Sequence, residues 1–182
     1  KNDRSEIKEL SPITQSNMFQ IIVPEDVMPH RRLEVVANGF QLLVLLPHYV
    51  TPGMKLYIKV PAIRCLLTLD PLKTEDRNQF DGNAVIEEVK RNPHTVAEKY
   101  NFLHEFEDSR SYPLHMAVAL GASVDVVDAL YNAFPQAIKA KCFFGRIQNT
   151  PLRVAFQYQA SPEVILLLLD LFPEAIREKD HQ

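Results

Sequence analysis

Two stretches decide the fold, Tyr112-Pro113-Leu114-His115-Met116-Ala117 and Thr150-Pro151-Leu152-Arg153-Val154-Ala155, because the second repeats the first at an offset of 38 residues. The same offset carries Ala122-Ser123 onto Ala160-Ser161, and Phe134 to Ile138 onto Phe172 to Ile176. Chance is a poor explanation for so many matches at one offset. The second half of the chain therefore contains a duplicated unit.

Each unit has the signals of a pair of helices. Proline is tolerated in the first helical turn, where its missing N–H would have had no intrahelical partner, so Pro113 and Pro151 predict the start of the first helix. Ser123 and Ser161 are favoured capping residues and predict the start of the second. That helix should end at Phe-Pro, because the residue before proline disfavours the α conformation.

The repeated motif resembles the Thr-Pro-Leu-His-x-Ala signature of ankyrin repeats. Tyr112 replaces the threonine in one copy and Arg153 the histidine in the other, and Phe-Pro replaces the usual closing glycine turn. We therefore expect divergent ankyrin-like repeats over about residues 83–180. An earlier, degenerate unit would have 84–91 as its outer helix and 92–96 as its ending.

Ankyrin stacks bind proteins through the loops between units and through their inner helices, so the resemblance implies a projecting loop at 139–149. Aromatic residues and arginine are enriched at the centres of interfaces. The alternative for the two phenylalanines is that they fold back over the helix ends as core. Two alternatives are open for the Arg153 side chain: it forms a hydrogen bond to the neighbouring turn, or it is simply solvated. The residues predicted to contact a partner are Phe143, Phe144, Arg146, Arg153, Tyr158, Leu167 and Leu171.

The last predicted helix, 164–172, is apolar nearly all round, whereas its equivalent at 124–134 keeps Asp125, Asp128 and Asn132. A helix that is apolar on every side is usually buried on more than one side. We expect it to pack on the first half of the chain, on further chain, or on another subunit.

A different duplication occupies the first half, where 22–33 aligns with 45–56 at an offset of 23 residues. Each copy has the order strand, proline, valine, proline, strand. Proline ends a strand because it cannot donate to the hydrogen-bond ladder. Asn38-Gly39 predicts a two-residue hairpin turn between the copies.

Two strands of this half have informative patterns. The run 42–46 is apolar on both faces, which predicts a central strand. Residues 55–60 alternate, with Leu56, Ile58 and Val60 on one face, which predicts a half-exposed strand. Over residues 18–61 the pattern resembles the "valine-proline-x-glycine-valine-x-proline-glycine" β repeats of multidomain proteins, although Asp26 and His30 stand where glycine is usual. It resembles more weakly the substrate-holding β domains of J-domain co-chaperones.

The expected fold class is α+β in two modules: a small antiparallel β sandwich or barrel-like unit, then an ankyrin-like stack of helical hairpins. The expected segments are a tail at 1–17, a β module at 18–70, a polar linker at 71–82 and helical repeats at 83–182. With 46% hydrophobic and 24% charged residues the chain has enough apolar material for such units.

The net charge and the cysteine content limit the expected binding partners and the expected cellular compartment. A net charge of −3 makes nucleic acid a poor partner. Cys65 and Cys142 lie in no pairing or metal-binding motif and are expected in different modules as buried thiols, which suits an intracellular, cytoplasmic protein. No apolar run is long enough to cross a membrane. The sequence begins at Lys1, so an organelle-targeting segment upstream would not be seen in it.

We find no phosphate-binding loop, dinucleotide fingerprint, zinc-binding histidine pair or nucleophile elbow, and predict no catalytic, cofactor-binding or metal-binding residues. The acidic cluster with a histidine at 104–108 is expected to be a solvated loop. The predicted function is a scaffold or adaptor subunit that binds one or more proteins, in a large complex or with a second copy of itself. Two alternatives remain open: a chaperone-like holder of hydrophobic segments, and a hydrolase using Cys65 or Cys142.

Overall fold

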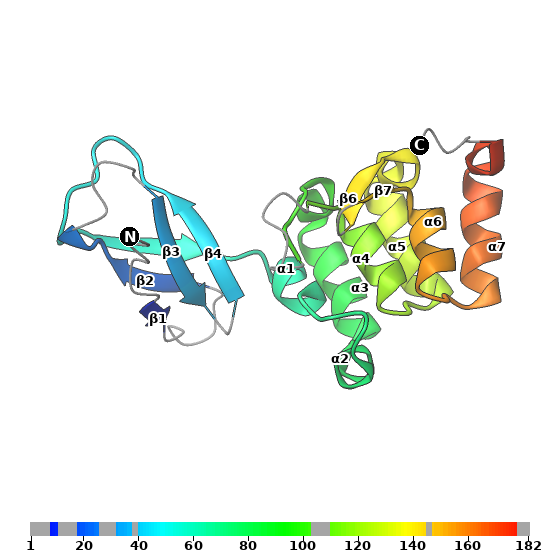
Figure 1. The fold of residues 1–182 in the computed structure, drawn as a ribbon, viewed down its shortest axis with the longest axis horizontal. Coiled ribbons are helices and arrows are strands. Elements are labelled where there is room, and N and C mark those ends of the chain that lie inside the picture. Colours follow the sequence, from blue (N-terminus) through cyan, green and yellow to red (C-terminus); the bar gives the residue numbers. More distant parts are fainter. Residues whose placement is uncertain are drawn as a thin grey trace. The chain divides into compact units, whose positions relative to one another are not determined.

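The computed structural model describes residues 8–10, 18–25, 32–37, 40–102, 110–144 and 147–177. The chain divides into two compact units, Lys1–Pro61 and Ala62–Gln182, shown in Figure 1.

The first unit consists of strands. Their bounds are β1 (Lys8–Leu10), β2 (Met18–Ile22), β3 (Arg32–Ala37), β4 (Phe40–Leu45) and β5 (Lys55–Lys59). One sheet has the order β1-β3-β4, and β2 pairs with β5 in another. Ala37 lies opposite Phe40, so two residues connect β3 to β4, as the Asn-Gly pair predicts.

The strand pairing of this unit repeats with its sequence. Arg32 pairs with Leu45 in one sheet and Ile22 pairs with Lys55 in the other. Adding 23 to the first number of the β3/β4 pair and subtracting 23 from the second turns 32 and 45 into 55 and 22, and the same shift relates every other pair except Ala37–Phe40. The first strand of each copy therefore pairs with the second strand of the other copy, so the two copies are related by an approximate twofold symmetry. Val23 and Leu46 are at equivalent positions and both are buried.

Three expectations for the first half need correction. The apolar strand at 42–46 is not central: β3 lies in the middle of its sheet, and β4 pairs only with β3 among the described residues. The unit is not wholly antiparallel, since β1 runs parallel to β3, and β1 lies within the expected tail. Strand position depends on distant pairing partners, which a local pattern of apolar residues does not specify. The alternation in β5 is confirmed, with Lys55, Tyr57 and Lys59 exposed.

The second unit is built from two layers of helices. The α-helices are α1 (Ala62–Leu67), α2 (Thr74–Gln79), α3 (Gly82–Arg91), α4 (Pro113–Ala119), α5 (Val124–Ala133), α6 (Pro151–Gln157) and α7 (Pro162–Leu171). We call α3, α5 and α7 the outer helices. A short 3₁₀ turn follows each of them, at η2 (Pro93–Ala97), η3 (Pro135–Lys139) and η4 (Pro173–Arg177). In one layer α4 contacts α1 and α6, and in the other α5 contacts α3 and α7 (Figure 1).

The predicted helix boundaries of the repeat are confirmed. Adding 38 to the bounds of α4, α5 and η3 gives those of α6, α7 and η4. The outer helices end at Asn92, Phe134 and Phe172, each with φ near −145° and ψ between 62° and 80°. A proline follows each of them, which explains why the helix cannot continue. A helix at Gly82–Arg91 and a 3₁₀ turn at Pro93–Ala97 have the same order, where the sequence predicted a helix at 84–91 and its ending at 92–96.

The turn from inner to outer helix is also duplicated. Gly121 has φ +85° and Gln159, at the equivalent position, has φ +54°. The Ala122 N–H donates to the Ala117 carbonyl, and the Ala160 N–H donates to the Ala155 carbonyl. This is the left-handed helix ending that glycine favours, so Gln159 adopts a conformation that is costly for a side chain with a Cβ.

The boundary between the units falls earlier than predicted. Residues 62–67 form α1 of the helical unit instead of the end of the β module, and α2 lies within the expected linker. Cys65 is therefore in the same unit as Cys142, not in a different one. Both helices have six residues, too few to show a helical period, and α2 has no buried residue.

Candidate protein-interaction surface

Equivalent positions of the two duplicated helix pairs differ in burial. On α4, which contacts α1, α5 and α6, His115 and Val118 are fully buried. On α6 the equivalent residues are Arg153, which is exposed, and Phe156, which is 60% exposed. Phe156 of the α6/α7 pair is therefore exposed to solvent, whereas the equivalent apolar residue of the α4/α5 pair, Val118, is buried.

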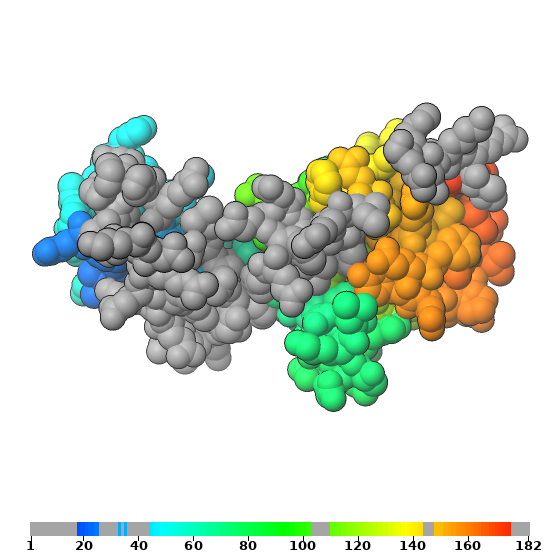
Figure 2. All heavy atoms as spheres, viewed as in Figure 1, coloured from blue at the N-terminus to red at the C-terminus, as the bar shows by residue number. Residues whose placement is uncertain are grey.

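The outer helix of the same pair carries a second exposed apolar side chain. Val164 and Leu168 are buried against the neighbouring helices, whereas Ile165 and Leu169 are only partly buried. Leu166 is 60% exposed and replaces the exposed Asp128 of α5. Residues of α6 and α7 are visible at the surface of the helical unit in Figure 2, coloured orange.

Acidic groups lie beside this apolar position. Glu163, Asp170 and Glu174 are exposed, and neither α5 nor α7 contains lysine or arginine. Hydrogen bonds from its own backbone and from Ser161 lower the pKa of Glu163. Within the described ranges none of these acids forms an ion pair with a basic residue. The outward side of α7 therefore combines an exposed leucine with carboxylates that have no ion-pair partner among the described residues.

The expected projecting loop is a short hairpin. Cys142–Phe144 (β6) and Ile147–Asn149 (β7) pair as antiparallel strands between the helix pairs. Phe143 is 43% exposed on β6. Phe144 lies in the same strand but its side chain is outside the described residues, as is Arg146. The hairpin places one of its predicted contact residues at the surface.

The remaining predicted contact residues are spread over α6 and α7. Arg153 is exposed, and Tyr158, Leu167 and Leu171 are partly buried. Burial is the main cause that raises the pKa of Tyr158, with a smaller contribution from Asp70. The prediction overlooked Phe156 and Leu166. Comparing the two copies would have singled out Leu166, which aligns with Asp128, but not Phe156, which aligns with the apolar Val118.

His115 has a structural position. It is fully buried, and its Nε2 lies 3.0 Å from the Ala140 carbonyl oxygen, which can only accept, so Nε2 is the donor. Burial lowers the pKa of His115 to about 4, although backbone hydrogen bonds at Ala140 and Asn149 oppose the shift. This hydrogen bond connects α4 to the segment that precedes the β6/β7 hairpin. It is not exposed for proton transfer with a substrate.

The two cysteines lack the environment of a reactive thiol. Burial raises the pKa of both Cys65 and Cys142, which favours the neutral thiol, even though Arg64 and Lys99 act in the opposite direction. Cysteine nucleophiles have a lowered pKa instead. Cys142 is buried and Cys65 is partly buried.

A polar cluster beneath α1 also has a structural explanation. The Tyr100 hydroxyl donates to the Thr95 carbonyl at 2.8 Å, and Arg64 Nη2 donates to the Asn101 carbonyl at 3.4 Å. Burial raises the pKa of Tyr100 and lowers that of Arg64. These groups connect α1 with the segment that follows η2.

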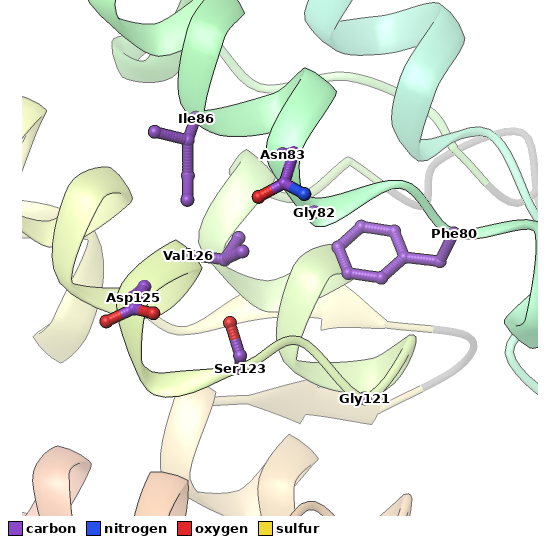
Figure 3. Close-up of a pocket in the computed structure, with 8 residues that line it drawn as sticks. All are labelled: Phe80, Gly82, Asn83, Ile86, Gly121, Ser123, Asp125 and Val126. Carbon is purple, nitrogen blue, oxygen red and sulfur yellow. The ribbon is translucent and has the colours of Figure 1, made fainter.

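A shallow cavity of about 280 Å³ lies between the first turns of α3 and α5. Figure 3 shows Asn83 and Ile86 of α3 across from Asp125 and Val126 of α5, with the Phe80 ring at the edge. Its lining contains no histidine or cysteine and a single carboxylate. This set of residues does not provide an acid and a base for catalysis.

No group of His, Cys, Asp and Glu side chains within the described ranges is arranged to hold a metal ion. The acidic cluster at 104–108 lies outside the described residues. Across the part of the chain that the structure describes, no helix has both the length and the apolarity to cross a bilayer. Comparisons with known proteins found no match to a family model, to a curated protein or to a solved structure.

Proposed function

We propose that the helical unit is a non-catalytic protein-interaction module of ankyrin-like type, and that the chain acts as a scaffold or adaptor. One observation carries this proposal: Phe156 and Leu166 are each 60% exposed on the α6/α7 pair, at positions where the α4/α5 pair has a buried valine and an aspartate. Apolar side chains on a protein surface are favourable to bury against a partner.

The alternative catalytic function has less support. Cys65 and Cys142 have raised pKa values, and the cavity between α3 and α5 lacks paired catalytic groups. A thiolate and a base within hydrogen-bond reach are the minimum for a cysteine hydrolase.

The chaperone-like alternative has one specific observation in its favour. The β unit exposes Ile22 and Leu45 at equivalent positions of its two copies, by 52% and 70%, together with Tyr49 and Tyr57. A substrate holder of this kind would bind unfolded, hydrophobic polypeptide. Binding of a denatured model protein by the full chain, lost in the Ile22→Lys/Leu45→Lys variant, would favour this alternative over an adaptor.

The tagged 182-residue chain, purified from cells after mild cross-linking, tests the adaptor function. We expect a stoichiometric companion with the wild type that is lost from the Phe156→Gln/Leu166→Gln variant. The Leu72→Gln variant is the matched control, since Leu72 is 81% exposed just before α2, and it should retain the companion. A wild-type chain that purifies alone, or a companion equally abundant with all three proteins, would contradict the proposal.

A further inference from the structure

The apolar residues on the outward side of α7 form a stripe. Pro162, Ile165, Leu166 and Leu169 follow the spacing i, i+3, i+4 and i+7, which places them on one side of a helix. Leu166 is the most exposed of the three aliphatic residues, since it is 60% exposed whereas Ile165 and Leu169 are partly buried. This stripe, which we name the α7 stripe, is long enough to lie along another helix over two turns.

A row of acids runs beside the α7 stripe. Glu163 and Asp170 are seven residues apart, two helical turns, and so lie on the same side of α7. Glu174 follows in η4, and all three side chains are exposed. A partner on the stripe would therefore meet negative charge along one border.

A further helix pair of the same kind is a poor occupant. Val118 and Ala119 are fully buried on α4, the helix that α6 contacts. The equivalent α6 residues are Phe156 and Gln157, which are much larger. Small residues allow close helix approach and overfilled contacts are destabilising, so the same packing would not form again on α6.

A second copy of the chain is also disfavoured. It would bring an identical acidic row, including Glu163 and Asp170, to the interface, where like charges cost free energy. A partner helix with lysine or arginine beside its apolar residues would instead complement both features of α7.

We propose that the α7 stripe and its acidic row bind a basic amphipathic helix of a partner protein. The apolar residues of that helix cover Leu166, Ile165 and Leu169, and its basic residues face Glu163 and Asp170. This proposal rests on the function proposed above and specifies the chemistry of the partner. Helices that dock on an apolar surface use the same i, i+3, i+4 and i+7 pattern of anchors.

Titration of the 182-residue chain with two synthetic peptides tests the proposal. Each has about 18 residues and a leucine stripe at helical spacing, flanked by lysine in one and by glutamate in the other. We expect saturable binding of the leucine–lysine peptide with one site per chain, weaker by about tenfold for Leu166→Gln and for Asp170→Lys. Binding should weaken as NaCl is raised from about 0.05 to about 0.3 M, because exposed charges are screened.

Matched controls come from the region of α2. Leu72 and Glu75 are exposed there, and Leu72→Gln and Glu75→Lys should change the affinity by less than about twofold. Equal affinity for the leucine–glutamate peptide, equal affinity of all variants, or failure of the wild type to bind would overturn the proposal. Dimerisation of the wild type that Leu166→Gln abolishes would assign the stripe to a second copy instead.

The two proposals fail differently. A companion that is retained by Leu166→Gln and lost from Phe156→Gln leaves the adaptor function in place and removes α7 as the docking site. A wild-type chain that has no companion in cells contradicts the adaptor function, whatever the peptides show.

Discussion

The α4/α5 and α6/α7 pairs have the same helix bounds shifted by 38 residues, yet their side chains experience different surroundings. His115 is fully buried and its equivalent, Arg153, is exposed; Val118 is fully buried and Phe156 is 60% exposed. The backbone of a repeat is set by its own caps and prolines. The burial of a repeat is set by its neighbours, so two copies can share a structure and differ in function.

The largest expected effect concerns the buried leucines of the outer helices. Leu130 of α5 and Leu168 of α7 are equivalent and 0% and 1% exposed. We expect Leu130→Ala to lower the free energy of unfolding by about 3 to 4 kcal/mol and Leu168→Ala by about 2 to 3 kcal/mol, because a cavity beside fewer neighbours collapses more easily. Urea denaturation measures both. An equal or larger loss for Leu168→Ala would show that the two pairs are equally constrained.

The next effect concerns His115. Its pKa is lowered from 6.5 in the unfolded chain to about 4, so its contribution to stability is complete above pH 6.5 and is lost as the pH falls toward 4. Between pH 7 and pH 5 this loss amounts to about 2 kcal/mol. His115→Gln should remove that part of the pH dependence, measured as the difference between the two urea midpoints at each pH. If the urea midpoints of the two proteins changed equally between pH 7 and pH 5, folding would not lower the pKa of His115, and the ring would be charged at pH 5 in the folded chain as well.

A smaller effect is expected at the inner-to-outer helix turns. Gln159→Gly should raise the free energy of unfolding by about 1 kcal/mol, since glycine adopts positive φ without strain. Gly121→Ala should lower it by at least about 1 kcal/mol, because an added Cβ would also lie 3.1 Å from Arg77 Nη2. Thermal melts of both variants are the measurement. If Gln159→Gly were destabilising, its side chain must contribute more than the strain costs.

The smallest effect on stability is expected on the outward face. Leu166→Gln and the reciprocal Asp128→Leu should each change the free energy of unfolding by less than about 0.5 kcal/mol, because both side chains are exposed. Their effects on retention by a hydrophobic column should be opposite. A loss of several kcal/mol for Leu166→Gln would show that this leucine is part of the core and not of a binding surface.

The helices of the duplicated units were predictable because their signals are local. Pro113, Pro151 and the Phe-Pro endings act on the residues next to them, and the structure has helix bounds at those positions. The short helix α1 and the strand β1 were not predictable. Six and three residues respectively are too few to be stable alone, so they form only through contacts with distant parts of the chain.

The candidate surface was predictable in location but not in its residues. The apolar composition of 164–172 pointed to α7, and the loop at 139–149 pointed to the hairpin. Leu167 and Leu171, chosen from composition, are partly buried, whereas Leu166 between them is exposed. Adjacent helical residues point in directions about 100° apart, and which of them faces solvent depends on how the helix is rotated against its neighbours.

The order of residues along the chain is sufficient to specify two duplications, the proline-led starts of α4 and α6, and the Phe-Pro ends of α5 and α7. Each of these follows from short-range sterics and backbone hydrogen bonding. Packing between pairs specifies that Val118 is core while Phe156 and Leu166 are surface. Burial is a property of the space around a side chain, and that space is filled around Val118 whereas Phe156 remains open to solvent.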